Sequence, residues 1–133
     1  MFNYGQWSSK EPREDDHIGF VYLIINKLNQ RKYIGKKLLY SKISKPPNEG
    51  KINRKRFIKD SDWLTYTGSS KELNNDILKF NLNNFEFFIL KWCKDKTELN
   101  YEELKEIVFR DAINNKDYYN KWVYCKIYGN KIK

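Results

Sequence analysis

Alternating apolar and polar positions mark a β-hairpin early in the chain. In the stretch GFVYLIIN, residues 19–26, successive side chains point to opposite faces, and both faces are apolar. A polar turn at residues 27–30 leads into a second run, residues 31–39, that returns antiparallel to the first. The pattern therefore predicts two paired strands, of which the first is buried on both faces.

The hairpin carries a tyrosine in each strand. Side chains two residues apart share a face of a strand, so Tyr33 and Gly35 lie together, and the turn brings Tyr33 near the face of Tyr22. Gly35 leaves open space beside the two rings. The pair is either a cross-strand contact that stabilises the hairpin or part of a site, and the spacing alone leaves both interpretations open.

The segment after the hairpin is rich in basic residues and contains turn-forming residues. Pro46, Pro47 and Gly50 rule out one continuous helix, so residues 36–60 are predicted to form an extended basic loop. Ser69, with Glu72 three residues later, has the spacing of a capping box and predicts the start of a helix.

The remaining elements complete an α+β pattern. Residues 83–92 are predicted as a mostly buried strand, and residues 97–114 as a second helix with Thr97 as its cap. The order β-β-α-β-α predicts an α/β (α+β) fold in which helices pack on a small three-stranded sheet of mixed or antiparallel strands. Residues 1–17 are expected to form an arm laid over this domain.

The size and composition favour one folded domain over residues 1–133. The 133 residues are 40% hydrophobic and 17% aromatic, and no apolar run reaches the roughly 18 residues that span a bilayer. The first residues do not have the pattern of a signal peptide, and Cys93 and Cys125 match no metal-ligand spacing. The expected setting is therefore intracellular, with no membrane partner.

The basic excess is concentrated in one segment. The net charge is +9, and residues 36–59 hold nine basic residues against one acidic residue, a balance of +8. Such a block suits a polyanion, because each cation set against a phosphate releases condensed counterions. Nucleic acid is the first partner to consider, and a solvated basic loop without a partner remains the alternative.

One glutamate on the second predicted helix differs from its neighbours. Glu103 has Leu99 and Ile107 four residues away on either side, so its side chain follows the apolar stripe. Glu106 instead has Arg110 at i+4, an ordinary solvated pairing. A carboxylate at the edge of a buried face costs desolvation unless a cation or hydrogen bonds meet it. Glu103 is therefore the candidate functional acid, unless its carboxylate simply extends to the solvent.

These motifs together resemble the GIY-YIG endonuclease superfamily, in particular its phage-type free-standing or homing members. The first motif corresponds to FVY, residues 20–22, and the second to YIG, residues 33–35. The stretch YTGSSKELNNDILKFNLNNFEFFIL, residues 66–90, is similar to the corresponding part of phage-type members. The resemblance covers roughly residues 19–120 and includes a helical glutamate followed by a Tyr-Asn pair, here Tyr119 and Asn120.

The resemblance implies a metal-dependent DNA endonuclease that nicks or cuts phosphodiester bonds. By this resemblance Tyr22 is the general base or positions the nucleophile, and Tyr33 orients water or phosphate. Glu103, with Glu106 as the fallback, holds one Mg²⁺ (or Mn²⁺), which suits a lone carboxylate completed by water and phosphate oxygens. Because a tyrosine with a pKa near 10 is a poor base, nearby lysines are expected to lower the pKa of Tyr22.

The family arginine expected about ten residues after the second-motif tyrosine is absent, and Ile43 stands there. Lys36 and Lys37, or Arg54 and Arg56 from the basic loop, are the candidates to supply its charge. Lys37 is preferred as the catalytic cation because some phage-type members carry a histidine at this place. A lysine lacks the bidentate fork of an arginine, so this substitution affects the proton-transfer scheme.

Several further residues are candidates for contact with nucleic acid. Tyr66 either packs the start of the first helix with Trp63 or lines the cleft, where backbone N–H groups at the helix N-terminus receive a phosphate. The full predicted set is Lys36, Lys42, Lys45, Lys51, Arg54, Lys55, Arg56, Tyr66, Ser69 and Asn120.

Two other functions remain compatible with the sequence. One is a nucleic-acid-binding module that keeps the fold but is catalytically impaired, and the other is an RNA-binding domain with exposed aromatic stacking platforms. The oligomeric state is open. A single site cuts one strand per event, so a double-strand break requires a homodimer or two successive nicks.

Overall fold

A mixed five-stranded sheet forms the centre of the protein. The structure is a computed structural model that describes residues 1–43 and 57–122. Across the sheet, the order is β1 (Phe2–Tyr4), β2 (Trp7–Ser9), β7 (Phe85–Cys93), β3 (Gly19–Asn26) and β4 (Lys32–Leu38). Strands β2 and β7 run parallel, and the other neighbours are antiparallel. Strand β4 is therefore an edge of the sheet.

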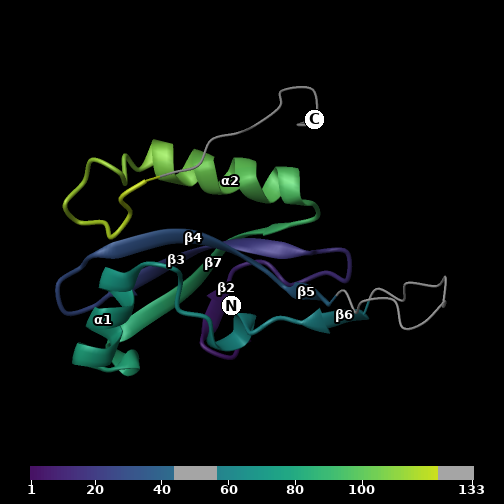
Figure 1. The fold of residues 1–133 in the computed structure, drawn as a ribbon, viewed down its shortest axis with the longest axis horizontal. Helices are drawn as coiled ribbons and strands as arrows, with labels where there is room; N and C mark the ends of the chain where they lie inside the picture. Colours follow the sequence, from purple (N-terminus) through teal and green to yellow (C-terminus); the bar gives the residue numbers. More distant parts are fainter. Residues whose placement is uncertain (44–56, 123–133) are drawn as a thin grey trace, which may run out of the picture.

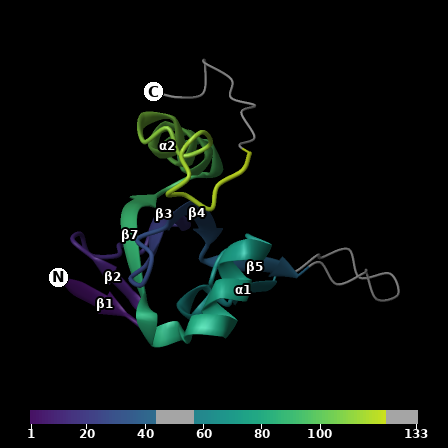
Figure 2. The ribbon, with the colours of Figure 1, turned by 90° about the vertical axis from the view of Figure 1, so that its left-hand side faces the viewer.

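The two helices lie on opposite sides of this sheet (Figure 1). Helix α1 (Lys71–Phe80) packs on the face of β3 that carries Tyr22, and α2 (Lys96–Phe109) packs on the face that carries Val21. The view along the sheet in Figure 2 shows the same separation. The alternation predicted for β3 is thus confirmed, since each face of this buried strand contributes to its own apolar core.

The predicted α+β class is confirmed, and β3, β4, α1, β7 and α2 follow the predicted order. The prediction of only three strands is wrong, because part of the expected arm over residues 1–17 forms β1 and β2. Gly5, with φ of 58°, makes the turn between them. Trp7 is completely buried against Phe20, Tyr22 and Phe87, and its indole N–H donates to the carbonyl oxygen of Trp63 at 2.6 Å. Three-residue strands are too short to show an alternation in the sequence.

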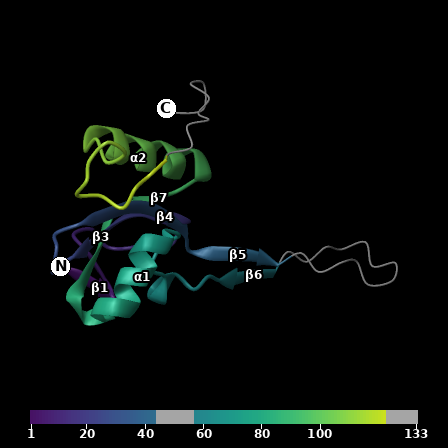
Figure 3. The same cartoon turned by 60° about the vertical axis from the view of Figure 1, so that its left-hand side comes forward.

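The predicted basic loop over residues 36–60 is also corrected. Its first residues belong to β4, and β5 (Tyr40–Ile43) pairs antiparallel with β6 (Phe57–Asp60). The resulting two-stranded ribbon extends away from the main sheet (Figure 3). A short 3₁₀ helix, Trp63–Thr65, leads from the ribbon toward α1, and a second one, Leu82–Asn84, leads into β7.

Both helices begin at residues other than those predicted. The cap of α1 is Ser70, whose hydroxyl accepts from the backbone N–H of Leu73 at 3.2 Å, so the prediction of Ser69 is wrong by one residue. The cap of α2 is Asp95, whose carboxylate accepts from the N–H of Glu98 at 2.7 Å, in place of Thr97. In each case another polar residue close to the predicted cap accepts from the backbone N–H instead.

None of the helices within residues 1–43 and 57–122 has the length and hydrophobicity of a membrane-spanning segment.

The burial of Trp7 makes the N-terminal hairpin a stabilising part of the sheet. We expect Trp7→Ala to lower the free energy of unfolding by about 3–5 kcal/mol, because it removes a buried indole and leaves a cavity. Urea denaturation followed by circular dichroism measures this. Phe2→Ala is the matched control, since Phe2 is 45% exposed, and we expect it to change stability by no more than about 0.5 kcal/mol. Equal effects of the two substitutions would contradict the hairpin's role in the core.

Candidate active site

The side chain of Tyr22 crosses the edge strand through a gap that Gly35 leaves. Tyr22 and Gly35 are directly paired between β3 and β4, and a Cβ atom at Gly35 would overlap the hydroxyl and ring of Tyr22. Gly68 closes on the same hydroxyl from the α1 side, where its φ of 85° disfavours other residues and a Cβ would lie 3.2 Å from the Tyr22 oxygen. Tyr22 is 1% exposed. Two glycines therefore define the position of this hydroxyl.

Tyr33 lies beside Tyr22, as the hairpin pattern predicted. The ring centroids of Tyr22 and Tyr33 are 6.1 Å apart, and those of Tyr22 and Tyr66 are 6.2 Å apart. The hydroxyls of Tyr33 and Ser69 share a hydrogen bond of 3.0 Å. This bond connects the hairpin to the residues just before α1, so Ser69 orients Tyr33.

Glu103 reaches this site from the other side of the sheet. Its neighbours Leu99 and Ile107 are buried, as predicted, and the Glu103 side chain is only 18% exposed. Burial raises the pKa of Glu103, and the ammonium of Lys36, 3.8 Å from Oε1, acts in the opposite direction. The predicted pairing of Glu106 is confirmed, since its carboxylate accepts from Nε of Arg110 at 2.9 Å.

A cavity of about 450 Å³ joins these groups. Tyr22 and Tyr33 line it from the hairpin, Ser69 and Ser70 from the start of α1, and Glu103 from α2. The segment from Tyr119 to Trp122 completes the wall. Two tyrosines, the start of a helix and a largely buried glutamate thus line one common space.

The two adjacent lysines of β4 point to different sides. Among the described residues that line the cavity, Lys36 is present and Lys37 is absent. The ammonium of Lys37 instead pairs with Asp62 at 2.6 Å and lies 4.1 Å from the centroid of the Tyr66 ring. Lys36 is therefore the cation that the fold brings to Glu103.

The expectation that lysines lower the pKa of Tyr22 is wrong. Burial raises the pKa of Tyr22 well above its usual value of 10.0, and the negative charge of Glu103 adds to this effect. Burial also raises the pKa of Tyr33. No lysine among the described residues offsets the effect of burial on the pKa of Tyr22. Both tyrosines therefore carry their protons at neutral pH.

Asn120 lines the cavity, but its amide contacts the backbone of the edge strand. Its Oδ1 accepts from the N–H of Ile34 at 3.0 Å, and its Nδ2 donates to the carbonyl oxygen of Ile34 at 2.8 Å. Next to it, the N–H of Tyr119 donates to the carbonyl oxygen of Lys32 at 2.7 Å. The predicted contact of Asn120 with nucleic acid stays a prediction, and the observed contacts assign it a structural role.

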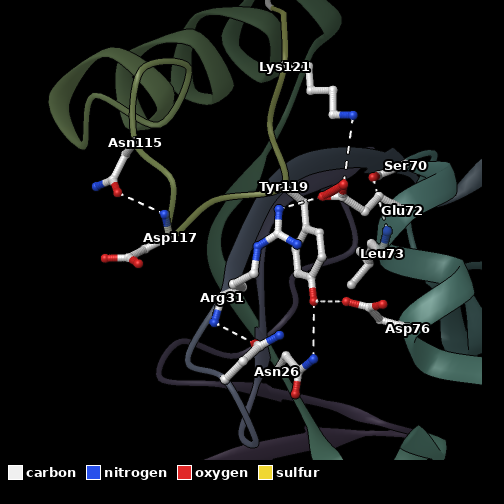
Figure 4. Close-up of polar contacts among 11 residues, drawn as sticks. Asn26, Arg31, Ser70, Glu72, Leu73, Asp76, Asn115, Asp117, Tyr119 and Lys121 are labelled. Atoms are coloured by element: carbon white, nitrogen blue, oxygen red, sulfur yellow. Dashed lines mark hydrogen bonds and ion pairs between the residues drawn. The ribbon is translucent and has the colours of Figure 1, made fainter. Parts of the chain in front are cut away.

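Figure 4 shows a polar network beside the cavity that the sequence did not reveal. The Tyr119 hydroxyl donates to Asp76 on α1 at 2.7 Å and accepts from Asn26 on β3 at 3.1 Å. The guanidinium of Arg31 lies 4.0 Å from the centroid of the Tyr119 ring and pairs with Glu72. This network holds α1 against the hairpin and so supports the wall that carries Ser69.

The one sequence signal for Arg31 was its spacing from Tyr33. Residues two apart in a strand share a face, which places Arg31 beside Tyr33 and toward α1. The carboxylate of Glu72, a residue predicted to belong to a capping box, is held by Arg31 and, at 3.8 Å, by Lys121.

The predicted basic contacts are only partly described. The backbone of Lys42 lies in β5. Five residues, Lys45, Lys51, Arg54, Lys55 and Arg56, lie outside the described residues. Their roles, and that of Lys42, stay predictions.

The close approach of Tyr22 to Gly35 is testable by a double-mutant cycle. We expect Gly35→Ala to destabilise the protein by about 1–3 kcal/mol, because the added methyl group forces the Tyr22 ring to move. In a Tyr22→Ala background the ring is gone, so the same substitution should cost less than about 0.5 kcal/mol. Urea denaturation of the four proteins measures both values. Equal costs in the two backgrounds would show that the ring does not occupy this space.

The comparisons with known proteins agree with this geometry. The model of the family described as "Putative endonuclease segE, GIY-YIG domain" matches residues 2–123 of the chain. No curated protein and no solved structure gives a match. The match includes the N-terminal hairpin as well as both tyrosine motifs and the helix of Glu103. The chain therefore belongs to the GIY-YIG endonuclease superfamily, in the family of segE-type domains.

Proposed function

We propose that this protein is a metal-dependent DNA endonuclease of the phage type, which hydrolyses phosphodiester bonds to nick or cut its substrate. The observation that carries the proposal is the single cavity that joins Tyr22, Tyr33 and Glu103. Hydrolysis requires an oriented water and neutralisation of the charge on the phosphate. The groups that line this cavity are suited to both tasks.

The donor set favours one hard cation held mainly by Glu103. Among the residues with described positions, no group of three or more Asp, Glu, His or Cys side chains surrounds a metal-sized space. A single carboxylate completed by water and phosphate oxygens suits Mg²⁺, which dehydrates reluctantly and keeps several waters, and also Mn²⁺. When bound, the cation supplies positive charge to the phosphate oxygens and the leaving group.

The tyrosines act as hydrogen-bond donors in this scheme. Because the pKa of Tyr22 is raised well above 10.0, its hydroxyl is neutral at physiological pH and orients the attacking water or a phosphate oxygen. Tyr33, held by Ser69 at 3.0 Å, orients the same phosphate from the other strand. Positioning of the nucleophile by Tyr22 is thus better supported than general-base catalysis.

Positive charge for the phosphate comes from Lys36 in place of the absent family arginine. Lys36 lines the cavity, and its ammonium is 3.8 Å from Glu103. Its flexible stem lets the charge reach a bound phosphate without a change in the backbone. Lys37, which pairs with Asp62, is the weaker candidate.

Cleavage of supercoiled plasmid with Mg²⁺ or with EDTA tests the proposed activity. We expect wild type to relax the plasmid only with Mg²⁺, and we expect Tyr22→Phe and Glu103→Gln each to lower the rate at least about 100-fold, as loss of a positioned catalytic group does. Glu106→Gln removes a partly exposed ion pair with Arg110 on the same helix and should leave the rate within about twofold. Circular dichroism establishes equal folding. Binding without cleavage by folded wild type would instead indicate an impaired nucleic-acid-binding module.

The basic segment accounts for the affinity in this proposal. Replacing Arg54, Lys55 and Arg56 together with Gln should flatten the dependence of log Kd on log salt by roughly 2 to 3 units if each contacts a duplex phosphate. Fluorescence anisotropy of a labelled duplex at several salt concentrations measures this slope. An unchanged slope would remove these three residues from the interface.

A further inference from the structure

The ammonium of Lys36 is held next to the carboxylate proposed to bind the metal. Its Nζ lies 3.8 Å from Oε1 of Glu103 and donates to Oδ1 of Asn100, which is one helical turn earlier on α2. The two acceptors come from one helix, and the Glu103 side chain is only 18% exposed. A positive charge thus lies beside this carboxylate.

This arrangement opposes binding of a second cation. A lysine ammonium and a divalent ion near one half-buried carboxylate repel each other, and the repulsion is screened less than at an open surface. Glu72, the other acidic residue in the cavity wall, is paired with Arg31 and Lys121. Among the described residues that line the cavity, no further unpaired carboxylate is present to balance both the Lys36 ammonium and a divalent ion at Glu103.

A phosphodiester supplies the missing negative charge. Lys36 lines the same cavity as Tyr22 and Tyr33, so a phosphate bound there would lie next to the side chain that carries this ammonium. A lysine is a compact charge on a flexible four-carbon stem, which lets it exchange one acceptor for another. Transfer of Lys36 from Glu103 to the phosphate would free the carboxylate when substrate is present.

We infer that Lys36 couples the two binding events: it occupies Glu103 in the free protein and moves to the scissile phosphate, so that divalent-metal binding at Glu103 depends on bound DNA. This inference rests on the proposed nuclease function. It makes Lys36 a positioning residue whose effect is measurable without turnover. Because coupling between two ligands is reciprocal, the metal also strengthens DNA binding.

Neighbouring Lys37 provides the matched control. Both lysines are in β4 and have the same charge, but Lys37 is not among the described residues that line the cavity, and its ammonium is 2.6 Å from Asp62. Loss of either lysine changes the net charge equally. A difference in Mn²⁺ affinity between Lys36→Met and Lys37→Met therefore reports the position of the lost charge and not the change in net charge.

The first test is Mn²⁺ binding in the absence of DNA, followed by electron paramagnetic resonance at pH 8. We expect Lys36→Met to bind Mn²⁺ about tenfold more tightly than wild type, within the usual range of coupling energies, and Lys37→Met to remain within about twofold of wild type. Adding Glu103→Gln to Lys36→Met should abolish the gain. Unchanged or weaker binding by folded Lys36→Met, or an equal gain in Lys37→Met, would overturn the inference.

The second test measures the coupling from the DNA side. With a hydrolysis-resistant phosphorothioate duplex, Mn²⁺ should increase the affinity of wild type for DNA, and the increase should be smaller in Lys36→Met. An equal increase in both proteins would contradict the inference. Plasmid cleavage by wild type separates the two proposals. If wild type cleaves but Lys36→Met does not bind Mn²⁺ more tightly, only the coupling is refuted. If folded wild type does not cleave, the proposed function is refuted.

Discussion

The close approach of Tyr22 to Gly35 is the constraint on which the rest of the site depends. Tyr22 originates from an interior strand, and its hydroxyl reaches the cavity only because β4 offers no side chain where the ring crosses it. Gly68 closes on the same hydroxyl from the α1 side. A glycine in a strand weakens the strand, and here that cost is offset by the burial of a tyrosine against Trp7 and Tyr33.

The same edge strand must also be protected from pairing with other chains. The segment after α2 forms hydrogen bonds with the backbone of this strand. The N–H of Lys32 donates to the carbonyl oxygen of Asp117 at 2.8 Å, and the carbonyl oxygen of Lys32 accepts from the N–H of Tyr119 at 2.7 Å. The side-chain amide of Asn120 bonds to both backbone groups of Ile34. Tyr119 then bonds to α1 through Asp76. The segment that covers the edge strand therefore also forms part of the cavity wall.

The alternation of side chains along β4 places its two lysines on opposite faces of the strand. Lys36 and Lys37 are adjacent and chemically identical, yet one faces α2 and Glu103 and the other faces Tyr66 and Asp62. Because successive side chains of a strand point to opposite faces, a shift of one residue in the register would exchange their partners. The paired glycine and tyrosine oppose such a shift, since any other residue opposite Tyr22 would collide with its ring.

Local periodicity was sufficient to predict the hairpin, both helices, the facing tyrosines and the apolar surroundings of Glu103, because each of these depends on residues close in sequence. It was insufficient for the three-residue strands and for the β5–β6 ribbon, which are stabilised by partners distant in the chain. The pairing of Lys36 with Glu103, the contact of Asn120 with Ile34 and the Arg31–Glu72 pair depend on how separate elements meet. The sequence by itself determined which groups lie on each face, and only the tertiary structure decided which faces meet around the cavity, since burial and hydrogen bonding join residues far apart in the chain.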